Sequence, residues 1–262
     1  MAALALPVLA GLLYLALASA PQNHLIINGA ALAAALLWAA FGQGPSTLAS
    51  ARIMCGLLLA LLYIPLITGP DIIGVTRWLP VGPFMLNAGT LAFPALAVLS
   101  ARDEQYAPAI LLLALFAALL QPDAALGFAI TFAAAGLHDV TKDWRIGLVT
   151  IIGFIASILM ALRGELPPQP FVERVLIDAL ASMPAVASLL IISLVGSFCL
   201  ILFGIHLPRR QRFALAGAMF GFVITAMMSN YPSILIGYGA APILGFGLAF
   251  GLAVRRKKDL TI

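Results

Sequence analysis

Long apolar runs separated by short polar connections are the feature that most constrains this chain. A helix needs about 20 mostly apolar residues to cross the roughly 30 Å hydrocarbon layer of a membrane, and several runs approach that length. Hydrophobic residues make up 63% of the chain and charged residues only 9%. The sequence therefore predicts an all-α, polytopic membrane helical bundle, in which residues 1–262 form a single integral membrane domain.

The breaks between the runs predict about ten transmembrane spans. In chain order they cover residues 1–20, 25–41, 51–68, 86–101, 106–120, 124–137, 146–162, 184–205, 213–229 and 233–254. The fifth and sixth spans are short, because a rise of about 1.5 Å per residue gives them only roughly 21 to 23 Å of helix. This pair is either two full crossings or a shallow, re-entrant hairpin that turns at residues 121–123.

The basic residues predict the orientation of the bundle. Loops on the cytoplasmic side of a membrane carry an excess of Lys and Arg. With the N-terminus inside, the outward connections hold only Arg77, Arg163 and Arg174, and the inward connections and the tail hold the other Lys and Arg residues. We therefore expect both termini in the cytoplasm, a main extracytoplasmic loop at 163–182 and a basic cytoplasmic tail at 255–262. The tail either anchors the last helix at anionic headgroups or binds a specific partner.

Ionisable residues are almost absent from the middle of the predicted spans, where each would cost about 3 kcal/mol or more. Because ion-coupled transporters normally keep such groups near the midplane, this class of protein is disfavoured. The acidic residues of the outward connections are Asp71, Asp123, Glu165, Glu173 and Asp178. Any chemistry is therefore expected at the outer interface.

Two of these acids are candidates for a functional site. Asp178 lies at the entry to the eighth span between apolar neighbours, so its carboxylate should be partly desolvated, which suits it to proton abstraction. Capping the eighth span is the alternative role of Asp178. Asp123 follows Pro122 at a helix start, where a carboxylate accepts hydrogen bonds from unpaired N–H groups, and this structural role explains it fully.

Arg77 and Arg174 are candidates for contacts with a phosphate or pyrophosphate, since a guanidinium group pairs with phosphate in a bidentate manner. Either side chain could instead extend to the membrane interface without a ligand. No metal or cofactor motif accompanies them. His24, His138 and His206 fall in three separate loops, and the sequence holds no nucleotide-binding or nucleic-acid-binding pattern.

Small residues inside the apolar runs predict close contacts between helices. Gly217 with Gly221, and Gly247 with Gly251, are spaced four residues apart. This spacing lets two helix backbones approach in lipid, so both pairs are predicted to be packing surfaces within the bundle.

Several motifs resemble the SEDS family of bacterial cell-shape, division and sporulation proteins, the RodA and FtsW group. That family has a GxxRWxxxGPxxxQPSELxK stretch followed by a span that ends in LQPD. Here the stretch reads GVTRWLPVGPFMLNAGTLAF from Gly74, and Leu120-Gln121-Pro122-Asp123 follows. ILIGYGAAPILGFGLAFGL from Ile234 is similar to the last span of the family, and the loop before Asp178 is similar to its large extracellular loop.

The resemblance implies a protein of the bacterial inner (cytoplasmic) membrane that polymerises lipid II, the undecaprenyl-pyrophosphate-linked precursor of peptidoglycan. Its usual partner is a penicillin-binding transpeptidase with a single span. Asp178 would be the general base, no cofactor is implied, and a divalent cation at the pyrophosphate is allowed. The residues expected to bind the substrate are Arg77, Trp78, Asn87, Gln121, Asp123, Arg174 and Tyr238.

This chain departs from the family pattern, as a short and divergent member would. The QPSE segment is replaced by Asn87-Ala88-Gly89-Thr90, which lacks the acidic residue, and Phe93 occupies the position of the lysine. The backbone determinants are kept while charges are lost. Two functions therefore stay open: a compact glycosyltransferase at the outer leaflet, and a non-catalytic protein of the same fold that binds a polyprenyl lipid or scaffolds a partner membrane protein.

Overall fold

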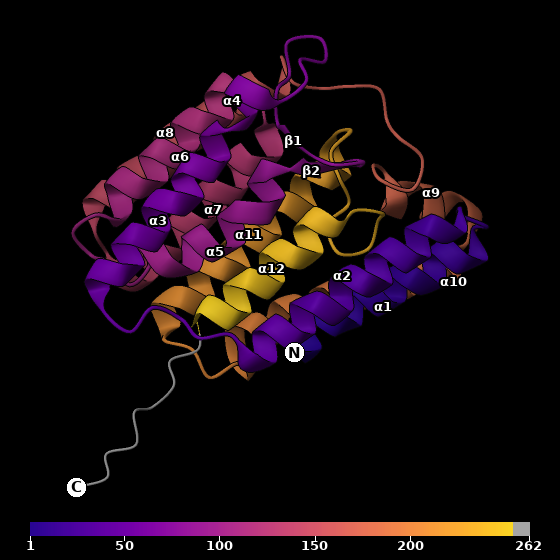
Figure 1. The fold of residues 1–262 in the computed structure, drawn as a ribbon, viewed down its shortest axis with the longest axis horizontal. Coiled ribbons are helices and arrows are strands. Elements are labelled where there is room, and N and C mark those ends of the chain that lie inside the picture. The colour runs from indigo at the N-terminus through magenta and orange to yellow at the C-terminus, as the bar shows by residue number, and fades with distance from the viewer. Residues whose placement is uncertain (254–262) are drawn as a thin grey trace, which may run out of the picture.

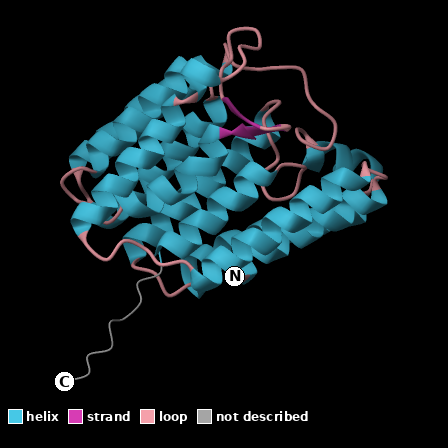
Figure 2. Cartoon of the chain, in the orientation of Figure 1, coloured by secondary structure: helices cyan, strands magenta, loops and turns pink. Residues whose placement is uncertain are grey.

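A computed structural model describes residues 1–253 of the chain (Figure 1). The predicted basic tail at 255–262 lies outside the described residues. Helices dominate the fold, and strands form a single small hairpin within the described part of the chain (Figure 2). The helices are α1 Ala2–Leu17, α2 Gln22–Phe41, α3 Leu48–Tyr63, α4 Pro65–Thr68, α5 Ala88–Ser100, α6 Ala107–Leu120, α7 Ala124–Thr141, α8 Trp144–Ala161, α9 Val175–Ser182, α10 Pro184–Cys199, the π-helix η1 Leu200–Gly204, α11 Arg209–Met228 and α12 Ala240–Ala253.

Within residues 1–253, six helical segments are long and apolar enough to cross a membrane. They are Gln22–Phe41, Leu48–Thr68, Ala124–Thr141, Trp144–Ala161, Pro184–Gly204 and Arg209–Met228. Helices α1, α5, α6 and α12 are apolar but shorter. Helix α7 runs beyond the predicted end of the sixth span at residue 137 and is long enough to cross, whereas α6 stays short. The count of ten crossings and the side on which the termini lie stay predictions.

The helices pack side by side, with α7 between α8 and α11, and with α12 between α2 and α5. Helices α1, α2 and α10 run together along one side of the molecule (Figure 1). A Cβ added at Gly217 or Gly221 on α11 would overlap the carbonyl oxygen of Phe132 or Phe128 on α7. Gly247 meets α2 in the same way. The predicted packing role of the spaced glycines is therefore confirmed.

The stretch before α5 folds as a β-hairpin, which corrects the prediction of a purely helical chain. Strands β1 Trp78–Val81 and β2 Phe84–Asn87 pair antiparallel, with Trp78 opposite Asn87. Gly82 begins the two-residue turn with φ of 57°, as a hairpin turn of this kind requires. Proline is tolerated here because a two-stranded hairpin has free edges. The backbone N–H of Ala88 donates to the carbonyl of Arg77 at 3.0 Å, so the hairpin sets Arg77 beside the start of α5.

The two ends of the bundle differ in their polar residues. The hairpin, α9 and the longest loops lie at one end, and the N-terminus and residue 253 lie at the other (Figures 1 and 2). Ion pairs such as Arg52 with Asp103 and Arg145 with Asp143 occur near the N-terminal end. The opposite end holds the buried pair of Arg77 and Asp123. We call this the hairpin end.

Candidate functional site

A cavity of about 690 Å³ opens at the hairpin end. Its walls come from the loop before β1, the hairpin, the connection between α8 and α9, and the start of α12. One part of the lining is polar and includes Arg77, Asn87 and Glu173. The other part is apolar and includes Ile72, Ile73, Phe84, Met85, Leu86, Leu166 and Pro167. Such a lining suits an amphiphilic ligand better than a purely polar one.

Arg77 is the basic residue in the lining of this cavity and is only 1% exposed. Its Nη1 atom lies 4.0 Å from Oδ1 of Asp123 and 3.5 Å from the carbonyl oxygen of Gly164. The guanidinium also lies over the rings of Trp78, at 4.9 Å, and Tyr231, at 4.8 Å. Its Nε has no hydrogen-bond partner among the described residues. This buried cation is thus held by long contacts and keeps capacity for an anionic ligand.

Asp123 and Asn87 are joined to one another and cap two helices. Oδ1 of Asp123 accepts from the N–H of Leu126 at 3.2 Å, which confirms its predicted role at the start of α7. Oδ2 of Asp123 accepts from Nδ2 of Asn87 at 3.3 Å. Oδ1 of Asn87 in turn accepts from the N–H of Thr90 at 2.8 Å, at the start of α5. The two helix starts and the arginine are therefore fixed by one polar cluster.

Gln121 is completely buried beneath this cluster and does not line the cavity. Its Nε2 donates to the carbonyl of Leu62, which ties the turn between α6 and α7 to α3. Its Oε1 has no partner within the described part of the chain. The structure thus gives Gln121 a positioning role, and direct contact with a substrate stays a prediction.

Tyr231 is a member of the site that sequence reasoning missed. It is 1% exposed, and its hydroxyl accepts from the N–H of Ala124 at 3.3 Å. Burial, and next the nearby Asp123, raise the pKa of Tyr231, so the phenol stays neutral. The only sequence signal was an aromatic residue before Pro232 in a connection between two apolar runs.

Tyr238 lines the cavity and is held by residues of α2. Its ring stacks on His24, with ring centroids 3.7 Å apart. Asn28 is 1% exposed and binds the flanking backbone twice, because its Nδ2 donates to the Gly237 carbonyl at 2.9 Å and its Oδ1 accepts from the Gly239 N–H at 3.1 Å. The loop around Tyr238 is therefore fixed from α2, which the sequence did not indicate.

Glu173 is the acidic residue in the lining of the cavity, and it is 9% exposed. Its Oε2 accepts from the N–H of Gln169 at 2.6 Å, and its backbone pairs with Pro232. Burial raises the pKa of Glu173, and Arg77 acts in the opposite direction more weakly. The sequence placed Glu173 among the outward acids but did not single it out as a base.

Asp178 and Arg174 lie outside the lining of this cavity. Asp178 is exposed on α9, near enough to Tyr14 of α1 for a Coulomb interaction. Arg174 is exposed at the start of α9, with φ of 58°. The structure therefore does not bring these two residues together with Arg77 and Asp123, and their roles as general base and phosphate contact stay predictions.

No family model matches the sequence, and no curated protein matches it. Solved structures do match. The Thermus thermophilus rod shape determining protein RodA has a TM-score of 0.66 at 21% sequence identity, covering 98% of this chain and 96% of that chain. This chain has a SEDS-like fold. A structure described as the coordination of polymerization and crosslinking by a peptidoglycan synthase complex has a TM-score of 0.67, also at 21% identity, covering 98% of this chain and 97% of that chain.

At 21% identity this likeness establishes the SEDS-like fold and not the reaction. It confirms the fold expected from the motifs, and it shows how those motifs combine. Trp78, Gly82 and Pro83 lie on the hairpin and Arg77 directly precedes it. The QPD residues lie at the turn before α7, and Tyr238 lies before α12. Arg77 and Tyr238 line the same cavity, and Arg77 lies beside Asp123. Three stretches that lie far apart in the sequence thus form one site.

The described residues contain no group of three or more His, Cys, Asp or Glu side chains that could hold a metal ion. The polar groups that line the cavity include a buried cation, Arg77, a buried carboxyl, Glu173, and the amide of Asn87. Chemically, this set can hold an anion at Arg77 and exchange a proton at Glu173.

Proposed function

We propose that this protein belongs to the cell-wall machinery of the bacterial inner membrane and polymerises a lipid-linked glycan precursor of the lipid II type at the outer leaflet. The observation that carries the proposal is the placement of a buried Arg77 and a buried Glu173 in the lining of one partly apolar cavity. The SEDS-like fold supports it, because a structural neighbour is described as part of a peptidoglycan synthase complex.

Arg77 is the proposed contact for the diphosphate of the substrate. A guanidinium presents its N–H donors in a planar fork that matches phosphate oxygens, and its unpartnered Nε supplies a donor beside the cavity. Asn87, Trp78 and Tyr238 complete the polar side. The apolar residues of the cavity, such as Ile73 and Phe84, suit the polyprenyl chain.

In the proposed reaction, a sugar hydroxyl of one glycan molecule attacks the anomeric carbon of a second, lipid-linked glycan molecule. A carbon–oxygen bond forms there, the bond from that carbon to the diphosphate breaks, and the lipid diphosphate leaves with the electron pair. Glu173 accepts the proton of the attacking hydroxyl, for which a raised pKa makes a carboxylate a stronger base. Arg77 stabilises the charge that develops on the leaving diphosphate. Asp178 is the second candidate for the base.

Two further parts of the proposal concern partners. A divalent cation could arrive with the diphosphate, and a chelator added to the polymerisation assay would test whether the reaction uses one. A membrane protein, such as a single-span transpeptidase, is proposed as the protein partner. It would use the glycan strand that this chain makes.

A second function is favoured by the residues that replace the charges of the family pattern. At the start of α5 the N–H of Thr90 donates to Oδ1 of Asn87, and Phe93 is completely buried and packs against Phe222. These positions serve the fold. A protein that binds the polyprenyl lipid or scaffolds a membrane partner without catalysis would keep them in this form.

The deciding experiment adds labelled lipid II to the purified full-length protein in detergent. We expect polymer from the intact protein and a loss of about 100-fold or more in Glu173→Gln, the range typical for a removed general base. Glu165→Gln is the matched control, because Glu165 lies in the same loop but is exposed and outside the cavity lining. Asp178→Asn is made in parallel.

Each result selects one function. If Asp178→Asn abolishes the polymer and Glu173→Gln keeps activity, Asp178 is the general base. Absence of polymer from the intact protein, with lipid II still bound, would leave the non-catalytic function. Equal losses in Glu165→Gln and Glu173→Gln would overturn a specific role for the buried carboxyl.

A further inference from the structure

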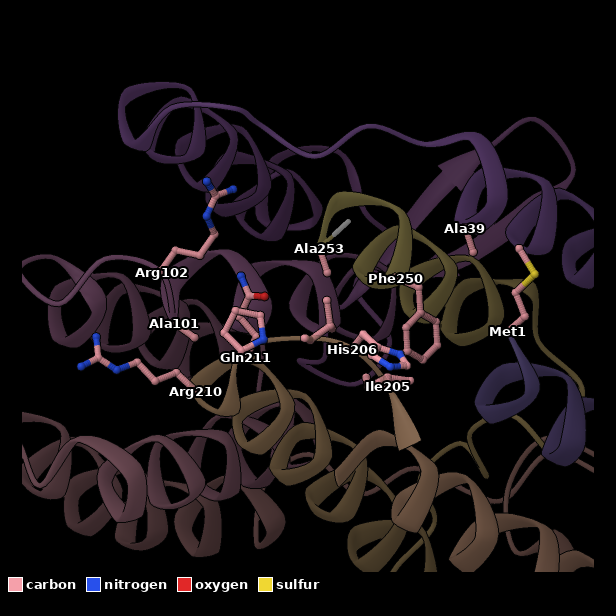
Figure 3. Close-up of a pocket in the computed structure, with 12 residues that line it drawn as sticks. Met1, Ala39, Ala101, Arg102, Ile205, His206, Arg210, Gln211, Phe250 and Ala253 are labelled. Atoms are coloured by element: carbon pink, nitrogen blue, oxygen red, sulfur yellow. The ribbon is translucent and has the colours of Figure 1, made fainter. Parts of the chain in front are cut away.

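A second cavity, of about 560 Å³, lies at the opposite end of the bundle from the hairpin. It is formed by the end of α2, the residues after α5, the segment between η1 and α11, the start of α11 and the end of α12 (Figure 3). Nothing in the proposed polymerisation uses it. Its polar lining residues include Arg102, Arg210, Gln211 and His206, and Ile205, Leu207 and Phe250 form an apolar side.

Gln211 is the residue that indicates a ligand. It is only 4% exposed, and its Oε1 has no hydrogen-bond partner among residues 1–253. Figure 3 shows its carboxamide directed into the cavity, between Arg102 and Ala253. A buried amide oxygen without a hydrogen-bond partner is unfavourable, so a ligand that donates to it would stabilise the protein. An amide in this position offers an acceptor as well as donors.

The start of α11 faces the same cavity. Pro208 and the first-turn residues Arg210 and Gln211 belong to its lining, and the helix begins without a side-chain cap. The first N–H groups of a helix have no partner inside the helix, and they carry a partial positive charge. A helix start of this kind favours an anionic group.

Two arginines add positive charge at the rim. Nη1 of Arg102 donates to the Pro45 carbonyl at 2.8 Å, and Arg210 forms an ion pair with Glu104. Both arginines belong to the lining of the cavity, and Figure 3 shows their side chains on the same side as Gln211, extending away from His206 and Phe250.

We propose that this cavity binds an anionic phosphate group that also carries a hydroxyl, as the phosphoglycerol headgroup of a membrane lipid does. The phosphate would meet the arginines and the start of α11, and the hydroxyl would donate to Oε1 of Gln211. The apolar side of the cavity would contact the beginning of the acyl chains. The inference does not depend on the reaction at the hairpin end.

The test uses the full chain in a nonionic detergent and four probes. They are short-chain phosphatidylglycerol, short-chain phosphatidylcholine, glycerol phosphate and inorganic phosphate. Binding is measured by native mass spectrometry and by the shift in melting temperature. Phosphatidylglycerol should bind and raise the melting temperature, and phosphatidylcholine should do neither, since its headgroup has no net charge and no hydroxyl donor.

Three variants distinguish specific binding of the lipid in the cavity from non-specific electrostatic attraction of the lipid to the protein. Arg210→Gln and Gln211→Met should each weaken phosphatidylglycerol binding by about tenfold or more, because each removes polar contacts to the ligand. Arg209→Gln is the matched control, since it removes the same charge one residue away, and Arg209 lies over Phe213 instead of in the cavity lining. It should bind within about twofold of the unaltered protein.

Several results would overturn the proposal. Equal binding of the two lipids would exclude recognition of the headgroup, and equal loss in Arg209→Gln and Arg210→Gln would indicate only unspecific attraction. Inorganic phosphate or glycerol phosphate as effective as the lipid would show a site for a soluble anion. If Gln211→Met does not fold, the comparison of phosphatidylglycerol binding between Arg210→Gln and Arg209→Gln is sufficient to test the proposal.

Discussion

The Nη1 atom of Arg77 lies 4.0 Å from Oδ1 of Asp123, and the two side chains are 2% and 1% exposed. This pair connects the residue before the hairpin to the residue that caps the start of α7. A buried ion pair contributes little net stability, whereas removal of one partner leaves an uncompensated charge. Arg77 is therefore held at the edge of the cavity by a contact that the fold cannot lose without a large loss of stability.

Removal of Arg77 should destabilise the protein strongly. Arg77→Gln is expected to lower the free energy of unfolding by about 3–5 kcal/mol, because Asp123 stays buried without its cation. Asp123→Asn in the same chain should restore part of this loss, since asparagine keeps the helix cap. Denaturation of the two single variants and the double variant in detergent measures the coupling, which we expect to exceed about 1 kcal/mol. Strictly additive effects would contradict the contact.

The two hydrogen bonds of Asn28 should control the loop that carries Tyr238. In Asn28→Asp, the N–H that donates to the Gly237 carbonyl is replaced by an oxygen, while the bond from the Gly239 N–H can remain. We expect a loss of about 2 kcal/mol or more, because a buried charged group is left facing a carbonyl. Thermal unfolding measures it. Asn230→Asp is the matched control, because it changes the same group at a less buried site, where the effect should be small.

The raised pKa of Glu173 predicts a pH-dependent effect on stability. The folded state binds the carboxyl proton of Glu173 more tightly than the unfolded state does. The stability that this proton contributes is therefore complete at low pH. It is lost as the pH rises from 4.5, the ordinary pKa of the group, through the higher pKa of the folded state. Glu173→Gln cannot lose a proton. Its melting temperature relative to the parent protein should therefore increase as the pH rises from about 4 to about 8, and an unchanged difference would contradict the burial of the carboxyl.

The same pKa shift should appear in the reaction itself. A base must be ionised to accept a proton, so the rate of lipid II polymerisation should rise with pH through the pKa of Glu173, at a higher pH than for an ordinary glutamate. Measurement of the polymerisation rate from about pH 4 to about pH 9 tests whether the rate rises in this way. A flat profile would exclude Glu173 as the base whose ionisation controls the rate.

Gly164 should tolerate no side chain. A Cβ there would overlap the carbonyl oxygen of Pro122, and the carbonyl of Gly164 itself contacts Arg77. Gly164→Ala should therefore lower the free energy of unfolding by about 2 kcal/mol or more and reduce polymerisation. Gly196→Ala is the matched control, because no atom lies within 4 Å of a Cβ at this position in α10. It should leave stability unchanged or raise it by about 0.5–1 kcal/mol.

Much of the fold could be predicted from the sequence, because the signals are local. Apolar runs of a given length indicate membrane helices wherever they occur, and Pro122-Asp123 marks the start of α7 through the chemistry of a helix cap. The hairpin at residues 78–87 is the exception. Its Gly82-Pro83 turn is visible in the sequence, but the prolines indicated only that this segment is not a regular membrane span.

Only the tertiary structure decided which of the two candidate carboxyls is buried in the lining of the cavity. Glu173 and Asp178 lie in one loop region, and the sequence around Asp178 is the more apolar. Burial of Glu173 depends on the cavity walls and on its pairing with Pro232, which is far away in the chain. The sequence by itself determined a bundle of apolar, membrane-type helices, and it predicted that one set of acids lies at one end of the bundle. Which of these two carboxyls is buried in the same cavity as Arg77 depended on how distant segments pack, because desolvation is set by neighbours in space and not in sequence.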